Sequence, residues 1–111
     1  MQHFPYIELK TNVEIKDKAA LKAALGELIA IIPEKTVGRT MVSVVEKDTL
    51  CFAGSDEPCA MIMTWVNPET IMDKNKDYCQ AVIEEVKNAL AIPEKRIYTT
   101  VAKVDTWCSR K

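Results

Sequence analysis

The sequence predicts an α/β domain, in which a duplicated β-α-β unit forms a four-stranded mixed sheet with two helices on one face. Strand-like and helix-like segments alternate along the chain, which is typical of this class. Both predicted helices are followed by Ile-Pro-Glu-Lys, at residues 32–35 and 92–95, and each copy leads into a β-branched segment. With 111 residues, 48% of them hydrophobic, we expect one domain over residues 1–111. Residues 1–4 form an N-terminal extension, and the repeat covers about 5–53 and 58–107.

The first unit contains strand, helix and strand signals in order. Residues 6–11 alternate apolar and polar side chains, the pattern of a half-buried strand. Asp17 is the expected N-cap of a helix over residues 18–31, which Pro33 ends. Residues 41–45 predict a strand, and residues 50–53 a second short strand beyond a turn at residues 47–48.

The second unit repeats the order. Residues 59–66 are an almost continuous apolar run, which predicts a strand buried on both faces. Asn67-Pro68 ends that run, a helix of about twenty residues then reaches Leu90, and residues 97–104 form the last strand. Parallel crossovers are right-handed, so both helices lie on one face of the sheet. Residues 59–63 show no alternation of polar and apolar side chains, so the face of the sheet that carries no helices is also apolar. We therefore expect an oligomer in which these sheet faces are buried at the centre.

The composition excludes several classes of protein. Fifteen basic and sixteen acidic residues give a net charge of -1, so nucleic acid is not the expected partner. No apolar run is long enough to span a membrane and no secretory signal is visible, so we expect a cytoplasmic protein. The four cysteines are widely spaced and there is one histidine, so we expect reduced thiols, no metal and no cofactor.

Three residues remain as candidates for chemistry, and each also has an ordinary structural interpretation. Pro5 is at the head of a strand, where proline is common. Lys35 follows the first helix, and its ordinary interpretation is a solvated charge in a loop. The ordinary interpretation of Tyr98, in the last strand, is a core residue.

Three segments in order carry a family resemblance. They are Pro-Tyr-Ile-Glu-Leu-Lys-Thr-Asn-Val at 5–13, Phe-Ala-Gly-Ser-Asp-Glu-Pro-Cys-Ala at 52–60 and Ile-Pro-Glu-Lys-Arg-Ile-Tyr at 92–98. Together they resemble the tautomerase superfamily, in its macrophage migration inhibitory factor and D-dopachrome tautomerase branch. The resemblance implies a β-α-β repeat assembled as a homotrimer, which agrees with the packing argument.

The resemblance also implies an isomerase that interconverts keto and enol forms of a small α-keto acid such as phenylpyruvate. Pro5 would be the general base, acting through a free secondary amine. Lys35 would pair with the substrate carboxylate or polarise its carbonyl, and Asn67 would offer its backbone N–H. Tyr98 would reach into the pocket of a neighbouring subunit.

Both ends of the printed sequence differ from the family pattern. Met1 to Phe4 precede Pro5, and a proline nitrogen within a peptide bond has no basic lone pair. We therefore expect tautomerase activity only in a chain that begins at Pro5. Beyond Trp107 the Trp-Asn-Gly-x-x-Phe ending of many relatives is missing, and this segment helps to line the pocket and join subunits. The alternative is a non-catalytic trimer that acts as a cytokine-like or protein-binding module, with non-classical secretion left open.

Overall fold

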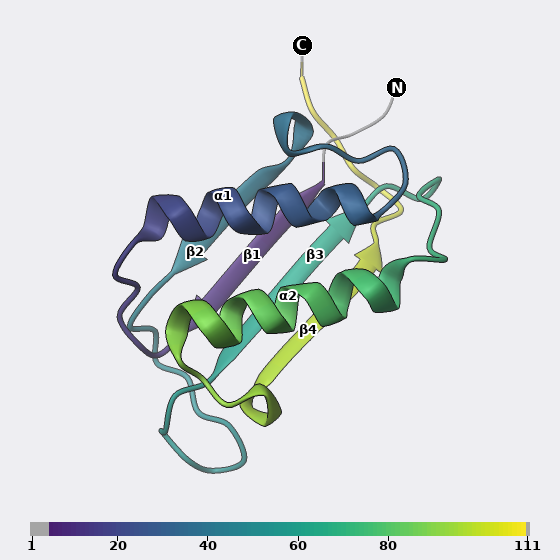
Figure 1. Ribbon diagram of the computed structural model, residues 1–111. Coiled ribbons are helices and arrows are strands. Elements are labelled where there is room, and N and C mark those ends of the chain that lie inside the picture. The colour runs from purple at the N-terminus through teal and green to yellow at the C-terminus, as the bar shows by residue number, and fades with distance from the viewer. Residues whose placement is uncertain (1–4, 111) are drawn as a thin grey trace.

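A computed structural model describes residues 5–110 of the chain, which form a single sheet covered by two helices (Figure 1). The strands are β1 (Tyr6–Thr11), β2 (Met41–Val45), β3 (Ala60–Val66) and β4 (Ile97–Lys103), and the helices are α1 (Lys18–Leu28) and α2 (Asn75–Leu90). The extension expected at residues 1–4 lies outside the described residues. The domain and repeat boundaries stay a prediction.

The sheet has the order β2-β1-β3-β4 and joins two parallel pairs by one antiparallel contact. β1 runs parallel to β2, β3 runs parallel to β4, and β1 runs antiparallel to β3 with Tyr6 opposite Trp65. Each parallel pair is linked by a helix, and both helices lie on the same face of the sheet (Figure 1). This confirms the predicted fold class, a duplicated β-α-β unit with a mixed sheet.

Local signals account for α1. The Asp17 carboxylate accepts a hydrogen bond from the Ala20 N–H at 3.0 Å, as the N-cap prediction requires. Leu21 and Leu25, four residues apart, bury one stripe of the helix against the sheet. The α-helix ends at Leu28, and residues 29–31 continue as one turn of 3-10 helix before Pro33.

The second helix is shorter than predicted. α2 begins at Asn75, because residues 67–74 form turns in which Thr70 N–H donates to the Asn67 carbonyl at 3.2 Å and Asn75 N–H donates to the Met72 carbonyl at 3.3 Å. Its last turn is closed by Ala91 in the left-handed conformation, with φ of 55°. The expected end near Leu90 is confirmed.

The strand predicted at residues 50–53 is wrong. Only one isolated bridge, between Phe52 and Ser55, forms there. The Arg96 guanidinium donates to carbonyls of this loop instead, at 2.8 Å to Pro58 and 3.0 Å to Glu57, and the Asn12 side chain adds further bonds to the loop backbone. Backbone groups satisfied by side chains have no need of a neighbouring strand.

The two faces of the sheet differ in burial. On β3, residues 60, 62, 64 and 66 are buried, and the two that belong to the core cluster, Ala60 and Ile62, pack with the helices. The intervening side chains lie on the opposite face, where Met61 and Met63 are half-buried and Trp65 is 41% exposed. The prediction of burial on both faces therefore does not hold within one chain, and the central oligomer stays a prediction. Within residues 5–110 no helix has the length and apolar character to cross a membrane.

Candidate functional site

Three of the four predicted site residues lie at one end of the sheet. Pro5 immediately precedes β1, and Asn67 immediately follows β3. Because these strands are antiparallel with Tyr6 opposite Trp65, the start of β1 and the end of β3 share one edge. Lys35 reaches the same place, since its Nζ atom donates to Asn67 Oδ1 at 3.2 Å. The structure therefore brings together residues that are 30 or more positions apart in the sequence.

Pro5 is buried and fixed through its carbonyl. The Met41 N–H, at the start of β2, donates to the Pro5 carbonyl oxygen at 2.9 Å. A proline ring lacks an N–H, so it is tolerated at the first position of a strand, where no ladder bond needs to be donated. The neighbouring strand thus anchors the residue and leaves its nitrogen out of the sheet hydrogen bonds.

Lys35 is an unusual lysine because it is only 7% exposed. Burial lowers the pKa of its ammonium group below the ordinary value, and the more distant charges of Glu34 and Glu69 oppose that shift. Among the described residues, no carboxylate comes within ion-pair distance of Lys35. A buried cation without a counter-ion is costly in free energy, and it suits the binding of an anion.

Asn67 is the direct partner of that cation. Its side chain is almost fully buried, at 3% exposure, and its Oδ1 atom accepts from both Lys35 Nζ and Thr70 Oγ1. Its Nδ2 atom is buried and has no hydrogen-bond partner among the described residues. From the sequence we expected only the backbone N–H of Asn67 to act, and we did not identify Thr70, for which its position three residues after Asn67 was the one available signal.

Aromatic side chains line the open face of the sheet beside Pro5. Trp65 packs against Tyr6, with ring centroids 5.7 Å apart, and against Trp107, at 6.3 Å and perpendicular. Trp107 reaches this end because the Val104 N–H donates to the Val66 carbonyl at 2.9 Å, which carries the chain past the end of β3. These rings offer an apolar surface near the buried cation. Neither Trp65 nor the pairing with Trp107 was identified from the sequence.

Tyr98 is at the other end of the sheet. It is 62% exposed and lies opposite Met61, near the start of β3. At about 3.3 Å per strand residue, Met61 and Asn67 are roughly 20 Å apart. Tyr98 packs edge-on against Phe52, with centroids 4.9 Å apart, and lines a cavity of about 430 Å³ together with Cys51 and Cys59. Tyr98 therefore lies far from Pro5, Lys35 and Asn67 within one chain, and its predicted role in the pocket of a neighbouring subunit stays a prediction.

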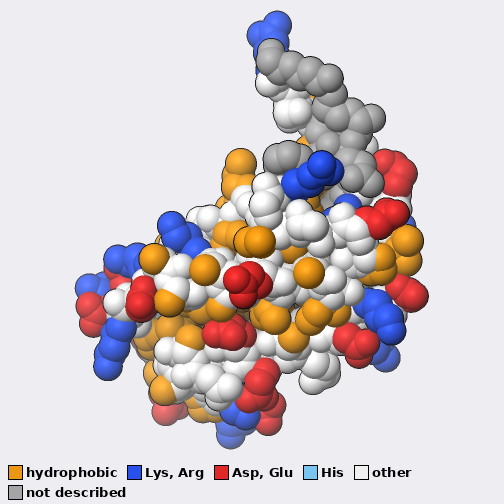
Figure 2. All heavy atoms as spheres, turned by 45° about the horizontal axis from the view of Figure 1, so that its top comes forward, with side chains coloured by type: hydrophobic (Ala, Val, Ile, Leu, Met, Phe, Trp, Pro, Cys, Tyr) orange, Lys and Arg blue, Asp and Glu red, His pale blue; other side chains and the backbone are white. Residues whose placement is uncertain are grey.

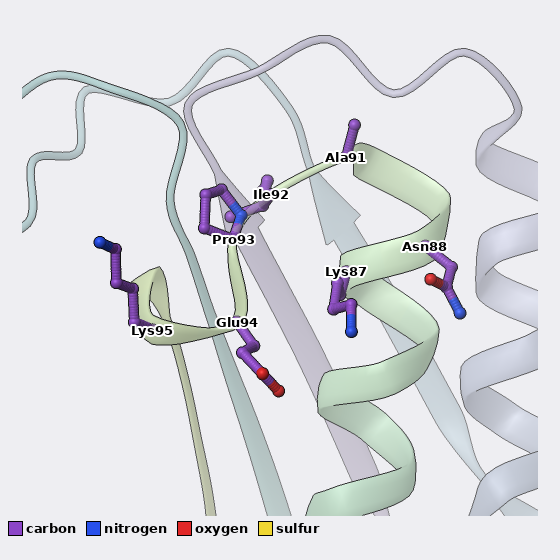
Figure 3. A pocket seen from close by; sticks show the side chains of 7 residues that line it. All are labelled: Lys87, Asn88, Ala91, Ile92, Pro93, Glu94 and Lys95. Carbon is purple, nitrogen blue, oxygen red and sulfur yellow. The ribbon is translucent and has the colours of Figure 1, made fainter.

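A larger hollow, of about 710 Å³, lies at the C-terminal end of α2, and its lining does not form a binding site. Figure 3 shows its lining, in which Lys95 points away from Lys87 and Glu94. Polar groups that converge on one point are what orient a small ligand. Because the Lys95 side chain does not point toward the other charged groups of this hollow, we place no site there.

The surface charge is mixed. Basic and acidic side chains are intermingled around the edges of the face seen in Figure 2, and the described part of that face has no extended basic patch. Residues 5–110 also hold no group of three or more His, Cys, Asp or Glu side chains arranged to bind a metal ion. The one concentrated electrostatic feature described above is the buried ammonium of Lys35.

Comparisons with known proteins agree with this geometry. The family model described as "Macrophage migration inhibitory factor (MIF)" matches residues 4–109. Among solved structures, MIF2 from Leishmania major is 24% identical, with a TM-score of 0.80 and 96% of each chain covered. The MIF-like protein from Entamoeba histolytica is 14% identical, with a TM-score of 0.85 and 97% of this chain and 96% of that chain covered. The homologue from Prochlorococcus marinus is 21% identical, with a TM-score of 0.79 and coverage of 90% and 89%.

These solved structures share the fold, and no curated protein sequence matches the chain significantly. The family model spans almost the whole chain. The chain therefore belongs to the macrophage migration inhibitory factor family, within the tautomerase superfamily.

Proposed function

We propose that the protein is a keto–enol tautomerase for a small α-keto acid of the phenylpyruvate type, with Pro5 as its base. The observation that carries this proposal is Lys35, a buried ammonium without a carboxylate partner among the described residues, at the sheet end where β1 begins after Pro5. A cation in that place gives an anionic substrate a fixed position beside the base. Family membership supports the same reaction class.

The chemistry requires the Pro5 nitrogen to be a free secondary amine. An α-amino group titrates at about 7.7–8.0 in a peptide, and burial or a nearby cation lowers that pKa. The amine takes a proton from the carbon beside the substrate carbonyl. The electrons of the broken C–H bond form the enol double bond, the carbonyl oxygen takes a proton from water, and the protonated Pro5 amine then gives its proton back to water. In the reverse direction the enol oxygen loses its proton and Pro5 returns one to carbon, so no oxidant or cofactor is consumed.

The remaining residues hold the substrate. Lys35 pairs with the carboxylate, or polarises the carbonyl, and the Asn67 backbone N–H donates to the same end of the molecule. The aromatic ring of the substrate packs on Trp65 and Trp107, whose rings adjoin the Pro5 end. The apolar surface of these tryptophans favours an aryl keto acid over a small aliphatic one.

We also propose that the protein assembles as a homotrimer and is located in the cytoplasm. Tyr98 is exposed and remote from Pro5 in its own chain, so it contributes to a site only across a subunit contact. The sheet face that carries Met61, Met63 and Trp65 is incompletely buried by one chain. An apolar face of this kind is suited to self-association.

The test is phenylpyruvate enol–keto conversion, followed by ultraviolet absorbance. Three proteins are compared: the full chain, a chain that begins at Pro5, and that shorter chain with Pro5→Gly. We expect turnover in the chain that begins at Pro5 and a large loss in its Pro5→Gly variant. If the chain that begins at Pro5 has no rate, and Pro5→Gly is equally inert, the tautomerase proposal fails. A folded trimer without turnover in any form would then favour the binding module.

A further inference from the structure

The side chain of Asn67 uses its hydrogen-bonding groups unequally. Oδ1 accepts two hydrogen bonds, from Lys35 Nζ and Thr70 Oγ1, while the buried Nδ2 has no partner among the described residues. Turning the amide over would place its NH₂ group against the lysine ammonium, which is also a donor. The orientation that leaves Nδ2 unpaired is therefore the one that accommodates Lys35.

The identity of the acceptor matters for the charge. An amide oxygen stabilises an ammonium by a hydrogen bond and leaves its net charge in place, whereas a carboxylate would cancel that charge. Glu34 and Glu69 are the acidic groups whose charges act on Lys35, and neither is within ion-pair distance of it. Lys35 is thus held by a neutral amide oxygen and keeps its capacity to bind an anion.

We propose that the Asn67 side chain, itself held by Thr70, is a positioning residue that fixes the Lys35 ammonium without neutralising it and so creates a carboxylate-binding subsite. This rests on the proposed role of Lys35 in substrate binding, and it deepens that role. It gives Asn67 a side-chain function besides its backbone N–H, and it adds Thr70 to the site.

The first test is the titration of Lys35, followed by NMR in protein labelled with ¹³C at the lysine ε position. Asn67→Asp is close in size and adds a negative charge, so the Lys35 pKa rises. Asn67→Leu removes the acceptor, so the Lys35 pKa falls below its value in the parent protein. Opposite shifts in the two variants are expected, with no shift in Asn88→Leu, an exposed asparagine of α2 whose side chain donates to Glu84. Unchanged or parallel shifts would overturn the proposal.

The second test measures carboxylate binding with 3-phenylpropanoate, which resembles phenylpyruvate but has no carbonyl to tautomerise. Its neutral amide, 3-phenylpropanamide, is the matched control. Both Asn67 variants weaken binding of the acid by about tenfold or more, since a hydrogen bond to a charged group is lost or the charge is cancelled. Binding of the amide stays within about twofold of the parent protein.

Thr70 provides a rescue experiment. Thr70→Val removes the hydroxyl that holds Asn67, so it weakens binding of the acid, by a smaller factor than Asn67→Leu. Thr70→Ser keeps the hydroxyl, so its binding of the acid matches that of the parent protein. Equal binding by the Val and Ser variants would remove Thr70 from the proposal. If the acid binds the Asn67 variants as tightly as the parent, the subsite itself is wrong.

Neither test depends on turnover. If phenylpyruvate is not converted but Lys35 and the acid respond as stated, the proposed function fails and the subsite stands. If phenylpyruvate is converted while the Asn67 variants leave Lys35 and the acid unaffected, the subsite fails alone. In an active protein that begins at Pro5, Asn67→Leu raises KM with little change in kcat, because it removes substrate binding rather than the base.

Discussion

The two copies of Ile-Pro-Glu-Lys have the same sequence and end in lysines with opposite environments. Lys35, in the first copy, is 7% exposed and bonded to Asn67. Lys95, in the second copy, is exposed and lines the open hollow of Figure 3. Four identical residues thus give one buried cation and one solvated cation, so the tetrapeptide alone does not determine the function of its lysine.

The backbone of the two copies differs as well. Glu34 adopts the left-handed conformation, with φ of 69°, whereas residues 94–96 form a turn of 3-10 helix. In the first copy the chain turns back so that Lys35 meets the loop after β3. In the second copy it continues into β4, and Arg96 rather than Lys95 makes the long-range bonds. The conformation of each copy therefore depends on its tertiary contacts rather than on the tetrapeptide sequence.

The largest difference between the copies should appear in catalysis. In a chain that begins at Pro5, Lys35→Met lowers kcat/KM for phenylpyruvate by about 10- to 100-fold, the value of a hydrogen bond to a charged group. Lys95→Met changes kcat/KM by less than about twofold, since an exposed side chain contributes little. Circular dichroism of both variants checks that they are folded. Equal losses in the two variants would refute the assignment of Lys35.

The glutamates should differ in the sign of their effect on stability. Glu34→Gly raises the free energy of unfolding by roughly 0.5–1 kcal/mol, because glycine removes the strain of a left-handed residue. Glu94→Gly lowers it by roughly 0.5–1 kcal/mol, because glycine in a helical turn loses more conformational freedom on folding. Urea denaturation at neutral pH measures both changes. A loss of stability in Glu34→Gly would contradict the left-handed turn.

The smallest expected difference is in the pH dependence of stability. Burial lowers the pKa of Lys35 in the folded state below its ordinary value of 10.5, so between the two pKa values the unfolded chain binds more protons. Stability relative to Lys35→Met therefore rises as pH increases through the folded pKa toward 10.5, and is lowest below it.

Urea midpoints from neutral pH to pH 10 test this dependence. Tyr78, whose pKa burial raises to about 12, destabilises the fold above pH 10 in every one of these proteins, so its effect cancels in the differences. A flat difference between the parent and Lys35→Met would show that Lys35 is solvated in solution.

Much of the fold could be predicted from local patterns. The period of residues 6–11, the Asp17 cap and the β-branched residues 41–45 are local signals, and each gave the observed element. The false strand at residues 50–53 had the same local character, but Arg96 and Asn12, some 40 positions away, satisfy the backbone of that loop. Contacts of that separation leave no trace in a local pattern.

The candidate site divides in the same way. Pro5, Lys35 and Asn67 were identified through family resemblance, and the structure places them at one sheet end. The use of the Asn67 side chain and the edge-to-face packing of Trp65 against Trp107 depend on tertiary packing between distant segments. A single sequence does not reveal which of two identical lysines is buried.

The most direct test of the central claim is the pH dependence of phenylpyruvate conversion by two proteins, the full chain and the chain that begins at Pro5. If Pro5 is the base, kcat/KM of the shorter chain rises with pH to a plateau. Its midpoint lies at or below the ordinary α-amino pKa of about 7.7–8.0, and the full chain shows no comparable rate. Equal rates with the same profile in both proteins would contradict the account, because an amide nitrogen cannot act as that base.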